Sequence, residues 1–234
     1  MTVMQQVLQT LTDFERDGFA LFEAVVPVPQ IEQLIDVVEE TRTEKAAPGL
    51  RNLLKRCSSI RRFANSSVAF RIAQEILGVT PLPVRAILFD KTPASNWYVT
   101  WHQDLSIPVK NRVDSDGYGP WSTKDGILHV QPPASILEQM VSLRIHLDAC
   151  SEANGAIKFV PGSHLAGILE PDQLGHFRDT HVPVVRSAER GDIIAMRPLV
   201  LHSSSVAETP DHRRVLHLEY AGTSLPSGME WAEA

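Results

Sequence analysis

Apolar residues near the N-terminus recur at the three- and four-residue spacing of amphipathic helices. This pattern predicts two scaffold helices, over Val3–Asp13 and Pro29–Arg42. A third helix is predicted over Ser67–Leu77, and Gly78 marks its end because glycine readily adopts the left-handed conformation of a helix C-terminus. The apolar run Gly18–Val26 predicts a strand. We therefore expect a mainly helical N-terminal part over about residues 1–80.

Beyond this part, the chain changes to short apolar runs separated by Gly, Pro, Asn and Asp, which is typical of an all-β sandwich or barrel. The β core is expected over about residues 84–222. Over Val141–Asp148 the alternation places Ser142, Arg144, His146 and Asp148 on one face, which solvent or a site could occupy. The predicted strands are Val84–Phe89, Trp97–His102, Val141–Leu147, Ala156–Val160, His181–Val185, Asp192–Met196 and Val215–Tyr220.

Residues 105–140 interrupt this rhythm with a long stretch that contains Gly and Pro. Long loops inside compact domains usually serve as lids or binding loops. We therefore predict that this segment covers the substrate.

The length and composition suit one globular unit. The chain has 234 residues, 43% of them apolar, which suffices for one hydrophobic core, and we expect residues 1–234 to form a single domain. The formal net charge of -6 provides no basic field for a phosphate backbone, so nucleic acid is not expected as a partner.

The two cysteines, Cys57 and Cys150, lie far apart and match neither a zinc spacing nor a disulfide framework, which favours a reducing cytoplasm. The segment Met1–Phe14 has no signal-peptide pattern, and no uninterrupted apolar stretch of about 18 residues occurs, so a membrane partner is not expected. The oligomeric state cannot be derived from the sequence.

The first candidate for chemistry is the HxD tripeptide His102–Asp104 at the end of a predicted strand. Side chains two positions apart on a strand point the same way, so the imidazole and the carboxylate can reach one metal ion. His202 also follows a predicted strand. Two histidines and one carboxylate form the facial triad of non-haem iron(II), which leaves coordination positions open.

Arg213 follows His202 by eleven residues and begins another strand. A buried arginine needs a carboxylate or phosphate partner, and its planar guanidinium suits a two-pronged carboxylate contact. The plainer alternative is that Arg213 and Arg214 are a solvated pair of charges. His164 competes with His202 as third ligand but lies in the turn sequence around Gly162 and lacks such an arginine downstream. The remaining histidines, His146, His176, His181, His212 and His217, are interpreted as core or surface residues.

The order HxD, distal His and Arg resembles the phytanoyl-CoA dioxygenase superfamily of 2-oxoglutarate oxygenases, over about Phe14–Tyr220. The stretches Val84–Pro93, Leu143–Asp148 and Val160–His164 are also similar to members of that family. The resemblance implies a mainly β fold, a double-stranded β-helix (a cupin-like jelly roll) with N-terminal helices packed on one side.

The same resemblance implies the cofactors Fe(II), 2-oxoglutarate and O2, with ascorbate as an optional reductant. It assigns His102, Asp104 and His202 to iron and to catalysis, and Arg213 and Ser204 to the distal carboxylate of 2-oxoglutarate. Ile87 and Arg144 match positions that line the cosubstrate pocket. Halogenating relatives replace the carboxylate ligand by a small residue, so Asp104 favours hydroxylation of an unactivated C–H bond of a small molecule, with release of succinate and CO2.

The substrate and the site of oxidation are not determined by the sequence. Candidates for the substrate wall are Trp97, Gln103, Trp121, Lys124, His129 and Gln131, although several of these could instead fix the loop 105–140. The alternative from another class is a cupin-like metal protein, an isomerase or a binding module, that does not use 2-oxoglutarate. This alternative predicts that Arg213 is dispensable.

Overall fold

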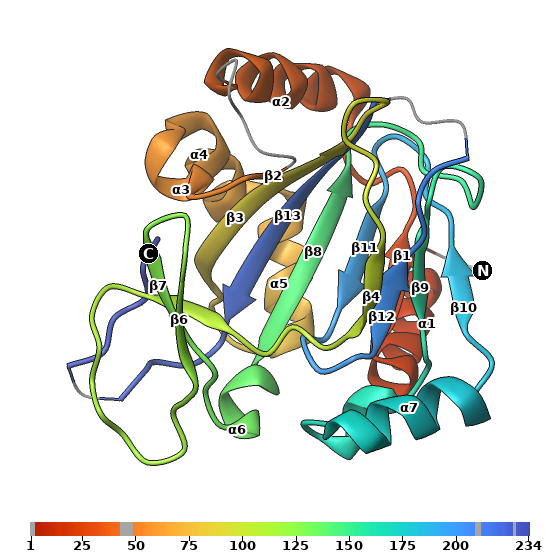
Figure 1. The fold of residues 1–234 in the computed structure, drawn as a ribbon. Helices are drawn as coiled ribbons and strands as arrows, with labels where there is room; N and C mark the ends of the chain where they lie inside the picture. Colours follow the sequence, from red (N-terminus) through yellow and green to blue (C-terminus); the bar gives the residue numbers. More distant parts are fainter. Residues whose placement is uncertain (1–2, 43–48, 209–211, 227) are drawn as a thin grey trace.

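The fold is built around a six-stranded antiparallel sheet (Figure 1). The structure, a computed structural model, describes residues 3–42, 49–208, 212–226 and 228–234. The sheet has the order β1-β11-β8-β13-β3-β2, so strands far apart in sequence are neighbours. Its strands are β1 (Phe19–Phe22), β11 (Ile193–Met196), β8 (Met140–His146), β13 (Arg213–Ala221), β3 (Leu82–Lys91) and β2 (Gly49–Leu50).

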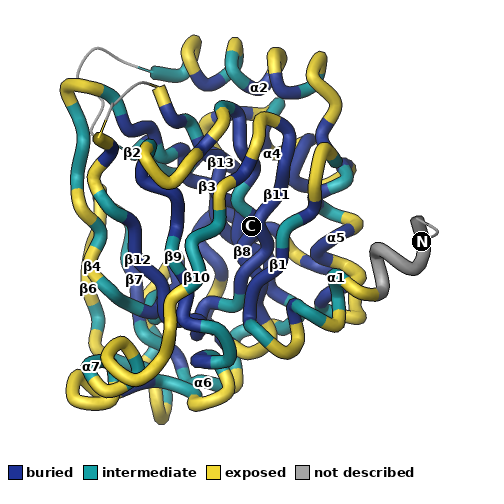
Figure 2. Tube along the Cα trace, turned by 90° about the vertical axis from the view of Figure 1, so that its right-hand side faces the viewer, coloured by how far each residue is buried: buried dark blue, intermediate teal, exposed yellow. Residues whose placement is uncertain are grey.

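A smaller four-stranded antiparallel sheet faces the inner side of this large sheet (Figure 2). Its strands, in the order β10-β9-β12-β4, are Val184–Arg186, Ile157–Phe159, His202–Ser204 and Val99–His102. At one end of the sandwich, apolar side chains fill the space between the sheets, and Phe19 stacks on Phe159 with 4.2 Å between ring centroids. The remaining space between the two sheets is available for a binding site.

Helices cover the outer face of the large sheet (Figures 1 and 2). These are α1 (Val3–Asp17), α2 (Val28–Thr41), α3 (Leu53–Arg56), α4 (Ser58–Ser66) and α5 (Val68–Leu77). The three predicted helices correspond to α1, α2 and α5. In α5, the Ser67 hydroxyl accepts from the amide of Ala69 at the start and Gly78 is left-handed at the end, as its sequence indicates.

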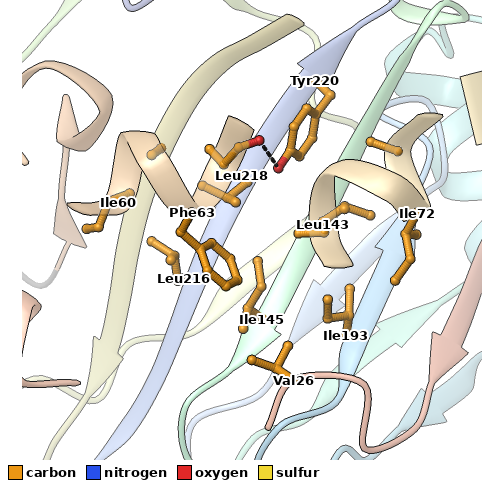
Figure 3. Packing of buried hydrophobic residues seen from close by; sticks show 14 of the residues in the cluster. Val26, Ile60, Phe63, Ile72, Leu143, Ile145, Ile193, Leu216, Leu218 and Tyr220 are labelled. Atoms are coloured by element: carbon orange, nitrogen blue, oxygen red, sulfur yellow. Dashed lines mark hydrogen bonds between the residues drawn. The ribbon is translucent and has the colours of Figure 1, made fainter. Parts of the chain in front are cut away.

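Alternation along the strands separates a dry outer face from a polar inner face. Leu143 and Ile145 of β8 pack with Leu216 and Leu218 of β13 beneath the helices (Figure 3). Here the hydroxyl of the fully buried Tyr220 donates to the carbonyl of Ala64 at 3.0 Å (Figure 3). The opposite face carries Ser142, Arg144 and His146, and it faces the interior of the sandwich rather than solvent: Ser142 and His146 are each 1% exposed.

The segment 105–140 has regular structure of its own. It contains β5 (Ile107–Val109), β6 (Trp121–Lys124), β7 (Ile127–Val130) and α6 (Ala134–Leu137), and its strands form a third sheet in the order β5-β7-β6. Val109 and Val130 belong to a separate apolar cluster with Trp231, which anchors the sheet. Its role as a cover for the substrate remains a prediction.

The prediction of a β sandwich of the jelly-roll type with N-terminal helices on one side is confirmed. Two further elements, the 3-10 helix Ser163–Ala166 and α7 (Pro171–Thr180), lie between β9 and β10. Among the residues that the structure describes, no helix is both long and apolar enough to cross a membrane.

Candidate metal centre and its pocket

The two sheets bring His102, Asp104 and His202 together, with one ligand atom of each within 4.8 Å of the others. The Nε2 atoms of His102 and His202 lie 3.7 and 3.8 Å from the two carboxylate oxygens of Asp104. These spacings leave room for an ion between the three groups. The donor set, two imidazoles and one carboxylate, is the one expected for non-haem iron(II).

Backbone hydrogen bonds orient both imidazoles. The Nδ1 atoms of His102 and His202 lie 2.8 and 2.9 Å from the carbonyl oxygens of Thr100 and Val200. A carbonyl can only accept, so Nδ1 carries the proton in each ring and the lone pair of Nε2 points toward Asp104. Rings fixed in this way are characteristic of metal ligands. The three residues therefore fit a divalent metal ion.

Strand pairing explains why residues a hundred positions apart meet. His102 on β4 and His202 on β12 are direct partners across the antiparallel pair, and the register shifts between His202 and Ser204. Just beyond β4, the amide of Asp104 donates to the carbonyl of Pro198 at 2.8 Å, which fixes the carboxylate beside the two rings.

The local electrostatics favour a charged Asp104 carboxylate and a neutral His202 ring. Burial opposes ionisation of Asp104, but the two histidines hold the pKa of its carboxyl at about 2. Burial lowers the pKa of His202 to about 4, against the opposing effect of Asp104. An ionised carboxylate and a neutral imidazole are the states that bind a metal.

The triad opens into a cavity of about 630 Å³, a size usual for small-molecule sites. The inner face of the large sheet supplies one wall, with Arg144, Arg213 and His217 among its residues. Apolar side chains, Ile87 and Ile157 among them, complete it. Of the residues predicted around the cosubstrate, all four line this cavity: Ile87, Arg144, Ser204 and Arg213.

A second buried cation, Lys91, lies beside Arg213, behind the residues that line the cavity. Lys91 is 0% exposed and is the register partner of Arg213, and its Nζ donates to Ser204 Oγ at 3.2 Å and to the carbonyl of Ser205. Burial, and then the charge of Arg213, lower the pKa of Lys91 to about 8. Sequence reasoning missed this residue, because a lysine at a strand end usually lies on the surface.

The backbone closes tightly around these two cations. A Cβ atom on Gly155, which has φ +72°, would lie 3.3 Å from Lys91 Nζ and 3.4 Å from Arg213 Nη1. The Nη1 group donates to the carbonyl of Gly155, whereas the Nε atoms of Arg144 and Arg213 are buried without a partner among the described residues. Charged donors left over in a buried pocket fit an anionic ligand such as a dicarboxylate.

The predicted substrate residues separate into two groups. Trp97, Gln103 and Lys124 line the cavity, whereas Trp121, His129 and Gln131 are not among its lining residues. The amide of Gln103 is engaged by backbone groups: its Nε2 donates to Gly167 and Leu199, and its Oε1 accepts from Leu169. Gln103 therefore fixes loops around the site.

The structure also shows where the competing ligand His164 and the adjacent arginines Arg213 and Arg214 lie. His164 packs away from the triad, with Nε2 at 3.2 Å from the carbonyl of Glu15. Arg213 is 3% exposed, so it is not part of a solvated pair. Its neighbour Arg214 points the other way and forms a two-pronged ion pair with Asp148 at 2.8 and 2.9 Å.

Comparisons with known proteins identify one matching family. The profile of the family described as phytanoyl-CoA dioxygenase (PhyH) matches residues 14–215. No curated protein matches the sequence significantly.

Solved structures are similar over nearly the whole chain. AviO1 from Streptomyces viridochromogenes Tue57 is 22% identical, with TM-score 0.69 and coverage of 94% of this chain and 96% of that chain. EctD from S. alaskensis with 2-oxoglutarate and 5-hydroxyectoine is 16% identical, with TM-score 0.69 and coverage of 94% and 76%. The epimerase SnoN in complex with Fe3+, alpha ketoglutarate and nogalamycin RO is 15% identical, with TM-score 0.72 and coverage of 96% and 92%.

Proposed function

The chain belongs to the phytanoyl-CoA dioxygenase family, and from that premise we propose that it is an Fe(II)- and 2-oxoglutarate-dependent oxygenase that hydroxylates a C–H bond of a small molecule. One observation carries the proposal: the triad of His102, Asp104 and His202 opens into the same cavity as Arg213 and Arg144. A metal ion and a dicarboxylate could therefore occupy adjacent positions.

The bound metal would supply the oxidising chemistry, by activating O2 together with 2-oxoglutarate and yielding succinate and CO2. His102, Asp104 and His202 would hold the ion from one side and leave the side toward the cavity open. The Nδ1 hydrogen bonds to Thr100 and Val200 keep both rings in place throughout.

Arg213 and Lys91 would bind the distal carboxylate of 2-oxoglutarate, and Ser204 would donate its hydroxyl to the same group. Lys91 Nζ is already 3.2 Å from Ser204 Oγ, so the three groups converge on one region. Arg144, which faces His217 across β8 and β13 and also lines the cavity, would contact the other end of the molecule. Burial, and then Arg213, lower the pKa of Arg144 to about 10, so it is charged at neutral pH.

Apolar walls would keep water away from the reacting carbon. The residues Ile87 and Phe89 on β3 line the cavity, and so does Leu105, which follows Asp104 in the chain. A dry pocket strengthens the charged contacts and limits side reactions. The retained Asp104 favours hydroxylation over halogenation. Proteins described as an epimerase and a carbocyclase have the same fold, so the product must be identified by experiment.

The decisive experiment measures succinate formed from 2-oxoglutarate by anaerobically iron-loaded protein, with and without O2, in the presence of a pooled small-molecule extract. We expect succinate that depends on iron and on O2, and a gain of one oxygen in a component of the pool. A protein that binds the metal, fails to bind 2-oxoglutarate and tolerates loss of Arg213 would instead be the cupin-like isomerase or binding module.

A further inference from the structure

Three cations gather at the end of the cavity away from Lys91 and Arg213. Arg85 on β3, Arg51 just after β2, and Lys124 at the end of β6 all line it. They come from the large sheet, the helical part and the third sheet, so only the fold brings them together. On β3, Arg85 and Lys91 are six positions apart and share a face, which separates this group from the cosubstrate end by roughly 20 Å along the strand.

The carboxylates near this group already have partners. Glu219 accepts from Arg85 Nη1 at 3.0 Å and lies 3.3 Å from His217 Nε2, and both Arg85 and Glu219 are buried. Asp125 pairs with Arg51 Nε at 2.8 Å. Glu233 accepts from the amides of Leu54 and Ala86. Asp104 belongs to the triad.

The three cations therefore keep a net positive charge and hydrogen-bond donors that none of the described carboxylates accepts from. Among the described residues, the ammonium of Lys124 has a neutral partner, Ser106 Oγ at 2.8 Å, and no carboxylate within ion-pair distance. Arg85 uses only Nη1 in hydrogen bonds with the described residues. Burial, and then the charge of Arg85, lower the pKa of both Arg51 and Lys124, so the three cations are close enough to repel one another.

We propose that this cluster, Arg51, Arg85 and Lys124, is a subsite for an anionic oxygen group of the substrate, so that the oxygenase acts on a small carboxylate or phosphate ester. The inference rests on the proposed function, which makes this cavity the substrate site. Ser106, which contacts Lys124, is two residues from Asp104. An anion bound at Lys124 therefore brings carbon atoms a few bonds away toward the metal centre.

The subsite suits one anionic group. Lys124 is exposed at the rim, whereas Arg85 is only 9% exposed inside the cavity, so the group would be held between an exposed and a buried cation. Hydrogen bonds between a charged donor and an anion are stronger than those between neutral groups. Losing the contact to Lys124 is therefore expected to weaken binding by roughly tenfold or more.

The test uses protein loaded with Zn²⁺ in place of iron and saturated with 2-oxoglutarate, so that the Arg213 end is filled. Calorimetric titrations compare benzoate, phenyl phosphate and benzamide, which share a ring and differ in the head group. We expect at least one of the two anions to bind saturably and at least about tenfold more tightly than benzamide. The better of the two anions identifies the head group as carboxylate or phosphate.

The variants assign the effect to Lys124. We expect Lys124→Met to reduce anion binding about tenfold and Lys124→Arg to retain it, with binding of Zn²⁺ and 2-oxoglutarate unchanged. Lys110→Met is the matched control, since Lys110 lies beside the same sheet but pairs with Glu230 outside the cavity. Equal binding of benzamide and the anions, no saturable anion binding, or equal behaviour of Lys124→Met and Lys110→Met overturns the inference. Absence of 2-oxoglutarate binding in the same samples overturns the proposed function and the inference with it.

Discussion

Arg213 and Lys91 are register partners on the adjacent strands β13 and β3, and their side chains are 3% and 0% exposed. Two buried cations side by side repel each other, and acceptors from Gly155, Ser204 and Ser205 offset only part of that cost. An anion with two carboxylate oxygens would relieve the repulsion. This pair is therefore where the proposed use of 2-oxoglutarate can be tested most directly.

Arg213→Lys is expected to weaken 2-oxoglutarate binding at least about tenfold, because lysine cannot reproduce the two-pronged contact of a guanidinium. The measurement is calorimetric titration of the metal-loaded protein. Arg214→Lys, one residue along and bound to Asp148 on the outer face, is the matched control and should leave the affinity unchanged. Unchanged affinity in Arg213→Lys would contradict the assignment.

Lys91→Met removes the second cation while keeping an unbranched side chain. We expect about a tenfold loss of 2-oxoglutarate affinity with little loss of stability, because burying a charge is costly and methionine carries none. The same titration is run on Lys55→Met, a change at an exposed lysine of α3. If both variants bind 2-oxoglutarate as the parent does, Lys91 has no part in the cosubstrate site.

Asp104→Ala should lower the affinity for Fe(II) by more than about 100-fold, since even partners of metal ligands contribute 10- to 100-fold. The fold should persist, because the triad lies in the open cavity and not in the core under the helices. Anaerobic metal titration and circular dichroism measure the two effects. His164→Ala, at the competing histidine, should bind iron normally, and loss of iron binding in this variant would contradict the assigned triad.

Glu233→Gln should flatten the pH dependence of stability. Burial raises the pKa of Glu233 to about 7, against hydrogen bonds from Leu54 and Ala86. The folded state thus binds the proton more tightly than the unfolded state, whose glutamate pKa is about 4.3. The stabilisation is full below about pH 4 and is lost as the pH rises through 7.

Glutamine stays neutral and can accept the same backbone bonds. Relative to the parent, Glu233→Gln should therefore be similar in stability at pH 4 and more stable at pH 8, by roughly 1–3 kcal/mol. Urea unfolding at the two pH values gives the difference. Parallel pH profiles of the parent and the variant would show that Glu233 does not titrate differently in the two states.

Tyr220→Phe should destabilise the protein by about 1–2 kcal/mol, because it leaves the carbonyl of Ala64 without its donor in the core. The comparison is Tyr98→Phe, at a tyrosine that is 56% exposed and should cost almost nothing. Thermal unfolding of the two variants tests whether this bond joins α4 to the sheet.

The sequence predicted the elements whose signals are local. The end of α5 followed from Gly78, and five strands of the large sheet followed from their apolar runs, whereas the two-residue strand β2 was not predicted. Helix α4 was missed because its sequence is mostly polar, and Ile60, Phe63 and Ala64 are its buried residues. Helix α7 was missed although Glu170 and Gln173 form a capping box at its start, and the strand predicted over His181–Val185 begins only at Val184.

The site likewise combines residues that have a local sequence signal with residues that have none. The spacing of His102 and Asp104 on one strand suggested a ligand pair, and the structure brings His202 to them. Lys91 and Arg85 gave no signal, because their importance lies in their partners across β3 and β13, Arg213 and Glu219. Strand register is set by packing over the whole sheet, and one sequence does not reveal it.

The pairing of His102 with His202 also bears on how the protein behaves in storage. Strand β4 forms the edge of the small sheet, and in the described part of the chain it pairs with β12 alone. Edge strands present unpaired backbone groups that other molecules can extend into larger sheets. A metal ion coordinated from both strands would fasten this edge in place. Metal occupancy would then guard the protein against self-association, and chelators would promote aggregation before they promote unfolding.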